Sequence, residues 1–107
     1  MRWAVGFLNE EIKAALDALP PDIRASFQRI VELIQANGLE RIREPYLKHL
    51  EGPLWEMRLK GRSGIARAVY VTATGMRIVV VHVFTKKTQK TPRHEINQAL
   101  KNAKEVQ

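Results

Sequence analysis

The sequence predicts an α+β domain in which a twisted antiparallel sheet packs against helices. Apolar residues recur at helical spacing in two segments of the N-terminal third, and three β-rich segments follow between residues 55 and 85. Runs of strands beside segregated helices are typical of this class. The chain has 107 residues, 45% of them hydrophobic, which fits one domain over residues 1–107 with its own core.

The N-terminal part predicts a strand followed by a helical hairpin on one face of the sheet. Residues 2–7 form a short apolar run, and Asn9 can cap the helix that follows. The pair Pro20–Pro21 ends this helix and begins the second one, which stops at Asn37–Gly38. Because residues 1–38 carry no pattern typical of a chemical site, we interpret the hairpin as core packing.

The rest of the chain predicts a three-stranded meander and a last helix. The segment 55–60 alternates apolar and charged residues, 65–72 is β-rich, and 76–85 is the longest strand. Pro92 opens the C-terminal helix, whereas prolines interrupt any regular pattern in residues 39–54. The predicted order is therefore β-α-α-β-β-β-α.

Positive charge is concentrated in one part of the chain. The net charge is +7, but residues 1–40 hold 4 Lys/Arg against 6 Asp/Glu, whereas residues 41–107 hold 14 against 5. General solubility does not require such segregation. A one-sided positive field favours a polyanion or an acidic protein as partner.

Several classes of site are excluded or disfavoured by residue content. There are no cysteines, which excludes disulfides, a cysteine nucleophile and cysteine-based zinc sites. The only serines are Ser26 and Ser63, and His49, His82 and His94 fall in three separate elements, so we expect neither a hydrolytic triad nor a metal or other cofactor. No apolar run is long enough for a membrane span, and we expect a cytoplasmic protein.

Basic strand residues are the remaining candidates for chemistry. Arg58 and Arg67 can face each other across a short hairpin, where an anion bound between them would relieve their repulsion. Lys86 and Lys87 follow at the end of the third strand, and because adjacent residues point to opposite sides, one of them can join the arginines. The alternative for a strand arginine is an ion pair with Glu56. Four more cations could line the approach: Lys60, Arg62, Lys90 and Arg93.

Three motifs in this order resemble a known family. They are the Trp-Glu-x-Arg strand at Trp55–Arg58, the Arg-x-x-Tyr strand at Arg67–Tyr70, and the Phe-x-Lys-Lys segment that ends in proline at Phe84–Pro92. Together with the helical hairpin and the connector "EPYLKHLEGPLWE", they are similar to the phage-derived HigB-like branch of the RelE/ParE toxin superfamily. The resemblance covers nearly the whole chain and implies a RelE-like fold.

The resemblance also implies a function, partners and roles for residues. It implies the toxin of a type II toxin-antitoxin system, an endoribonuclease that cleaves messenger RNA at the ribosome, without a metal, and leaves a 2′,3′-cyclic phosphate. A helix-turn-helix antitoxin of HigA type would bind and neutralise it in a joint oligomer. Arg67 would grip the scissile phosphate, with Arg58, Lys87 and Lys86 beside it. Relatives place a tyrosine or histidine after the last strand, so His94, or a lysine with a depressed pKa, would transfer the proton.

Other functions remain open at this point. The same superfamily includes toxins of ParE type that target gyrase and are not nucleases, so the fold does not determine the activity. A non-catalytic RNA-binding module would show salt-sensitive binding without cleavage. A third possibility is a protein-interaction domain whose basic face binds an acidic partner.

Overall fold

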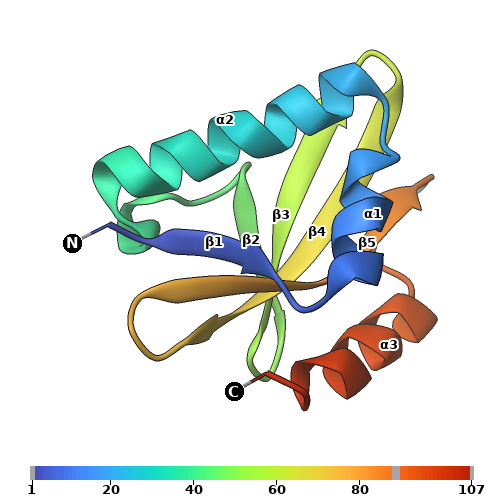
Figure 1. The fold of residues 1–107 in the computed structure, drawn as a ribbon. Helices are drawn as coiled ribbons and strands as arrows, with labels where there is room; N and C mark the ends of the chain where they lie inside the picture. Colours follow the sequence, from blue (N-terminus) through green and yellow to red (C-terminus); the bar gives the residue numbers. More distant parts are fainter. Residues whose placement is uncertain (1, 88–89, 107) are drawn as a thin grey trace.

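A computed structural model describes residues 2–87 and 90–106 of the chain, in which a five-stranded sheet lies between helices (Figure 1). The strands are β1 (Ala4–Phe7), β2 (Leu47–Glu51), β3 (Leu54–Gly61), β4 (Gly64–Ala73) and β5 (Arg77–Lys86). The helices are α1 (Glu10–Asp17), α2 (Pro21–Asn37), the short 3-10 helix η1 (Leu39–Arg41), and α3 (Arg93–Ala103). The strand order across the sheet is β1-β5-β4-β3-β2.

The predicted α+β class is confirmed, with two differences in detail. The structure adds β2, so the order is β-α-α-β-β-β-β-α, and β1 pairs with β5 in parallel, which makes the sheet mixed rather than wholly antiparallel. The strand β2 was not predicted because it is short and lies between Pro45 and the Gly52–Pro53 turn. Its pairing with β3, rather than its own pattern, makes it a strand.

The helical hairpin forms where the sequence predicts it. The side chain of Asn9 accepts a hydrogen bond from the backbone N–H of Ile12 at 2.9 Å, which caps α1. Pro21 opens α2, and Gly38 follows its end with a φ of 91°, a conformation that favours glycine. The start of α1 and both ends of α2 thus lie at residues suited to those positions.

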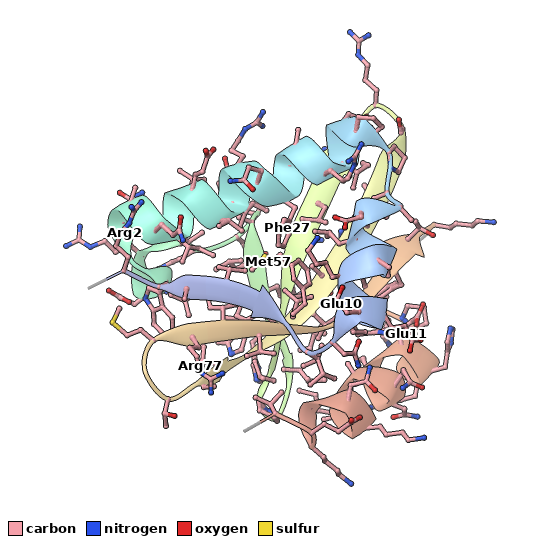
Figure 2. The ribbon with its side chains drawn as sticks, in the orientation of Figure 1. Arg2, Glu10, Glu11, Phe27, Met57 and Arg77 are labelled. Carbon is pink, nitrogen blue, oxygen red and sulfur yellow. The ribbon has the colours of Figure 1, made fainter. Side chains whose placement is uncertain are left out.

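The two faces of the sheet carry separate apolar cores. The first core lies between the hairpin and the sheet, and Figure 2 shows Phe27 of α2 and Met57 of β3 in this space. The second core lies against α3, where Ala99 belongs to one buried cluster with Val69 and Val81. Because helices cover both faces, side chains on either side of the sheet can be buried.

None of the helices in the described ranges 2–87 and 90–106 has the length and apolar character that crossing a bilayer requires.

Removal of a core side chain of α2 is expected to destabilise the fold strongly. Ile34 is fully buried in the first core, at 0% exposure, so Ile34→Ala should lower the free energy of unfolding by roughly 2–5 kcal/mol through lost burial and the cavity left behind. Urea unfolding followed by circular dichroism measures this loss. Glu32→Ala, at an exposed position of the same helix, is the matched control and should change stability by less than about 0.5 kcal/mol. Equal losses would contradict the packing described.

Candidate functional site

The strand register gathers basic residues on the α3 side of the sheet. Residues directly opposite each other on neighbouring strands point to the same face, as do residues two apart along one strand. Three cross-strand rows on this face result: Lys48–Glu56–Val69, Arg58–Arg67–Phe84 and Lys60–Ile65–Lys86. We call Arg58, Arg67 and Lys86 the basic cluster, with Lys48 and Lys60 on its rim.

The basic cluster runs from the surface into the interior. Arg67 and Lys86 are buried, at 3% and 7% exposure, whereas the side chain of Arg58 is 23% exposed. Lys48 and Lys60 are exposed. The Nη1 atom of Arg58 lies 3.9 Å from a carboxylate oxygen of Glu44, which is itself mostly exposed, so this ion pair is weak. The arrangement is a cationic rim above a buried cationic floor.

A buried polar network forms the floor. Oε2 of Glu56 lies 3.5 Å from Nε of Arg67, and Oε1 of Glu56 accepts a hydrogen bond of 2.8 Å from the hydroxyl of Thr91. The ammonium of Lys86 in turn donates a long hydrogen bond of 3.5 Å to the Thr91 oxygen. Nη1 of Arg67 donates to the carbonyl of Ala66 at 3.0 Å, while its buried Nε–H lacks an acceptor with good geometry among the described residues. Three strands and the segment before α3 therefore meet in one network.

Burial and like charge act together on the two buried cations. Desolvation lowers the pKa of Arg67, and Arg58 adds to this effect, whereas Glu56 opposes it. Desolvation also lowers the pKa of Lys86, and the positive charges of Arg67, Arg58 and Lys48 lower it further, whereas Glu56 opposes this effect. Arg67 keeps its charge because a guanidinium starts from a very high pKa. Of the three cations in the cluster, Lys86 has the lowest ordinary pKa, so the lowering acts on the group that releases its proton most readily.

The structure brings together some of the residues predicted from sequence. Arg58, Arg67 and Lys86 share one face, and Lys60 lies in the row beside them. Of the two adjacent lysines, Lys86 is the one that joins the arginines. Lys87 is exposed and lines a small pocket of about 240 Å³.

Other predicted residues lie apart from the buried network. The side chain of His94 is 79% exposed on α3, with Nε2 3.7 Å from Glu95. Arg93 is engaged in two hydrogen bonds to the carboxylate of Glu51, at 2.9 and 2.8 Å, which tie α3 to β2. Arg62 is exposed in the β3–β4 turn, and Lys90 is exposed ahead of α3.

Sequence reasoning missed two members of the site. Lys48 was missed because β2 was not predicted, and the segment "LKHLE" between Pro45 and Gly52 has no alternation of apolar and polar residues that would indicate a strand. Thr91 was missed because an uncharged residue in an irregular segment carries no pattern. The partner considered for Arg67, Glu56, is the one the structure shows.

No group of three or more histidine or carboxylate side chains in the described part of the chain is arranged to hold a metal ion. The side chains that the structure brings into contact in the network are those of arginine, lysine, glutamate and threonine.

Comparison with known proteins places the chain in a family. The model of the family described as phage derived protein Gp49-like matches residues 14–104, so the chain belongs to that family. No curated protein matches the sequence. The phage-derived family membership expected from the three motifs is thus confirmed.

Two solved structures share the fold. One is the Escherichia coli toxin RelE in the free state, a mutant with two arginines replaced by alanine, with a TM-score of 0.64 and 20% identity over 94% of this chain and 97% of that chain. The other is the archaeal RelE-RelB complex from Pyrococcus horikoshii OT3, with a TM-score of 0.56 and 21% identity over 79% of this chain and 96% of that chain. The predicted RelE-like fold is confirmed.

The ion pair between Glu51 and Arg93 gives a testable pH dependence. Hydrogen bonds from Arg93 hold the pKa of Glu51 below its ordinary value of 4.5, so the pair stabilises the fold above that value and the stabilisation is lost as the pH falls through the lowered pKa. Arg93→Ala should return the pKa of Glu51 toward 4.5. Carbon-13 NMR titration of the carboxyl groups measures this shift. Arg24→Ala, at an exposed position of α2, is the control and should leave Glu51 unchanged; a similar rise there would refute the assignment.

Proposed function

We propose that the protein is the toxin of a toxin-antitoxin pair and that it cleaves RNA at the basic cluster. The observation that carries this proposal is the placement of Arg58, Arg67 and Lys86 on one face of a sheet with the RelE fold. The fold alone is compatible with several functions, but three cations on neighbouring strands of one face, two of them buried, suit a phosphodiester group.

RNA supplies its own nucleophile, which fits the residues present. Attack of the 2′-oxygen on the adjacent phosphorus forms the 2′,3′-cyclic phosphate and breaks the bond to the 5′-oxygen of the next nucleotide. The protein has to align these atoms and stabilise the negative charge that grows on the phosphate oxygens. No serine, cysteine or metal is needed for either task.

The different burial of Arg58 and Arg67 favours different roles for them in binding and in catalysis. Arg58 is the accessible guanidinium and is suited to the first contact with a phosphate oxygen. Arg67 lies in the floor, where the low dielectric strengthens its field on charge that develops above it. A direct contact of Arg67 with the phosphate through two hydrogen bonds stays a prediction. One edge of its guanidinium faces Glu56, so a phosphate would have to bind at another edge.

The proton of the 2′-hydroxyl needs an acceptor. Lys86 is the candidate with support from the structure, because its lowered pKa increases the neutral fraction that can accept a proton near pH 7. His94 is the candidate from the family resemblance, but its exposure on α3 gives it no pre-set position near the buried cluster. Comparison of Lys86→Met with His94→Ala separates the two.

Two partners belong to this proposal. Messenger RNA, presented at the ribosome, is the substrate that the family resemblance implies, and a cationic rim suits an assembly made largely of RNA. The antitoxin is a protein with an acidic segment that covers the basic cluster or holds the toxin away from the ribosome. The archaeal neighbour is a complex of RelE with RelB, which supports the existence of such a partner. We place the toxin in the cytoplasm, where its substrate is.

Loss of Arg67 should remove the activity. Arg67→Ala deletes a charge that stabilises the transition state, and by analogy with loss of one oxyanion-hole donor the cleavage rate should fall roughly 10²- to 10³-fold. Expression of the wild-type chain alone should arrest bacterial growth and cut messenger RNA, as mapped by primer extension, and the variant should do neither. Arg67→Lys should recover only part of the rate.

Folding must be controlled in this experiment because Arg67 is buried beside Glu56. Thermal melts verify that each variant is folded, and Arg24→Ala, exposed on α2, provides a matched arginine control with wild-type toxicity. A folded Arg67→Ala variant with full toxicity would remove Arg67 from the site. Growth arrest without RNA cleavage would favour the gyrase-directed alternative, and RNA binding without either effect would favour a non-catalytic binding module.

Lys48 should contribute to RNA binding rather than to cleavage. It is exposed on β2 next to the network, so Lys48→Ala should raise KM for RNA by about 3- to 10-fold with little change in kcat. Loss of one phosphate contact should also reduce the slope of log Kd against log salt concentration by roughly 0.7. Lys101→Ala, exposed on α3, is the control and should change neither quantity. An unchanged slope for Lys48→Ala would exclude that contact.

A further inference from the structure

Glu56 is the least expected member of the basic face. A carboxylate in a phosphate-binding surface repels the ligand, yet Glu56 lies at the centre of this one, in a row between Lys48 and Val69. Its side chain is 3% exposed, so it does not meet solvent or serve solubility. A buried carboxylate is costly unless it is paired and hydrogen-bonded. Its position therefore calls for an explanation from its contacts.

Both oxygens of Glu56 are used, and they reach different parts of the chain. Oε2 faces Nε of Arg67 on β4 at 3.5 Å, and Oε1 accepts the hydrogen bond of 2.8 Å from Thr91, ahead of α3. Thr91 is buried and also accepts from the ammonium of Lys86 at 3.5 Å. One carboxylate on β3 is thus connected to both buried cations, directly to Arg67 and through Thr91 to Lys86.

The guanidinium of Arg67 depends on Glu56 for its position. Arg67 has a further hydrogen bond from Nη1 to the carbonyl of Ala66, but its Nε–H has no acceptor with good geometry in the described part of the chain. Repulsion between Arg58 and Arg67, which are directly opposite each other, would turn the guanidinium away from the cluster unless a negative group held it. Glu56 is the carboxylate in contact with it.

We propose that Glu56 is a positioning residue, which holds the guanidinium of Arg67 and, through Thr91, the ammonium of Lys86 in the arrangement that meets the scissile phosphate. This inference rests on the proposed ribonuclease function. Glu56 itself touches neither the phosphate nor the reacting 2′-hydroxyl. Its effect on the reaction is exerted through the geometry of the two cations.

Removal of the negative charge of Glu56 distinguishes a positioning role of this residue from other roles. Glu56→Gln removes a negative charge but keeps an oxygen that can accept from Thr91, so the surface becomes more positive and RNA should bind as tightly as before or more tightly. If Glu56 positions Arg67 and Lys86, kcat should nevertheless fall, by roughly 10- to 100-fold, because a small displacement of catalytic groups is costly. A purely structural residue would not weaken catalysis while strengthening binding.

The experiment compares cleavage and binding in the same variants of the full chain. Cleavage is measured as kcat and KM on ribosomes programmed with a short messenger RNA. Binding is measured as Kd for an RNA oligonucleotide with 2′-O-methyl groups, which lacks the nucleophile. Thr91→Val leaves the Glu56–Arg67 pair in place but removes the link to Lys86, and it should lower kcat several-fold with an unchanged Kd. Glu32→Gln, exposed on α2, is the matched control and should behave as wild type.

Each outcome decides the question. Lower kcat with equal or lower Kd for Glu56→Gln supports positioning, whereas kcat equal to or above that of wild type overturns it and makes Glu56 a simple counter-charge. If Glu56→Gln does not fold, Thr91→Val decides, and a wild-type kcat there overturns the inference. If wild-type protein neither cleaves RNA nor arrests growth, the proposed function itself is wrong, and this inference is overturned with it.

Discussion

The register of the β3–β4 hairpin is the constraint on which the site depends. Arg58 faces Arg67 only because Gly61 pairs with Gly64 at the turn. The residue pairs between these two positions follow in an unbroken antiparallel register. A slip of one residue on either strand would send the arginine of that strand toward the apolar core and move Met57 or Ala68 out of it. Burial of the opposite face of the sheet therefore fixes the positions of the cations. The geometry of the site thus depends on the packing of the core.

The tip of the hairpin is fastened to the helices in a way that supports this register. The backbone N–H of Ser63 donates a hydrogen bond of 2.8 Å to the carboxylate of Asp22, which lowers the pKa of Asp22. Gly61 lies so close that a Cβ atom there would stand 2.5 Å from Asp22 Oδ2. The absence of a side chain at Gly61 is thus a condition for the contact between α2 and the turn. The helical hairpin, which we interpret from its sequence as core packing, contacts the turn that aligns the arginines.

Arg58 and Arg67 of the candidate site could be predicted from the sequence. The burial of Arg67 and the presence of Lys48 beside the cluster could not. The alternation in residues 55–60 places Arg58 on one face, and a charged residue within the apolar segment 65–72 marks Arg67, because both signals are local. The burial of Arg67 and its pairing with Glu56 depend on how α3 and Thr91 cover the sheet, and the sequence pattern of the strands does not contain that information. Lys48 required the pairing of β2, which arises from tertiary contact.

The parallel pairing of β1 with β5 has a consequence for synthesis of the chain. Gly6 pairs with Val79, so the first strand stays without its partner until roughly 70 further residues have been made. The cations themselves come from β3, β4 and β5, and Thr91 lies beyond all of them. A nascent chain therefore cannot assemble the complete network before β3, β4, β5 and Thr91 have all been translated. For a protein proposed to attack translation, this topology delays the appearance of the basic cluster and its network until Thr91 has been made.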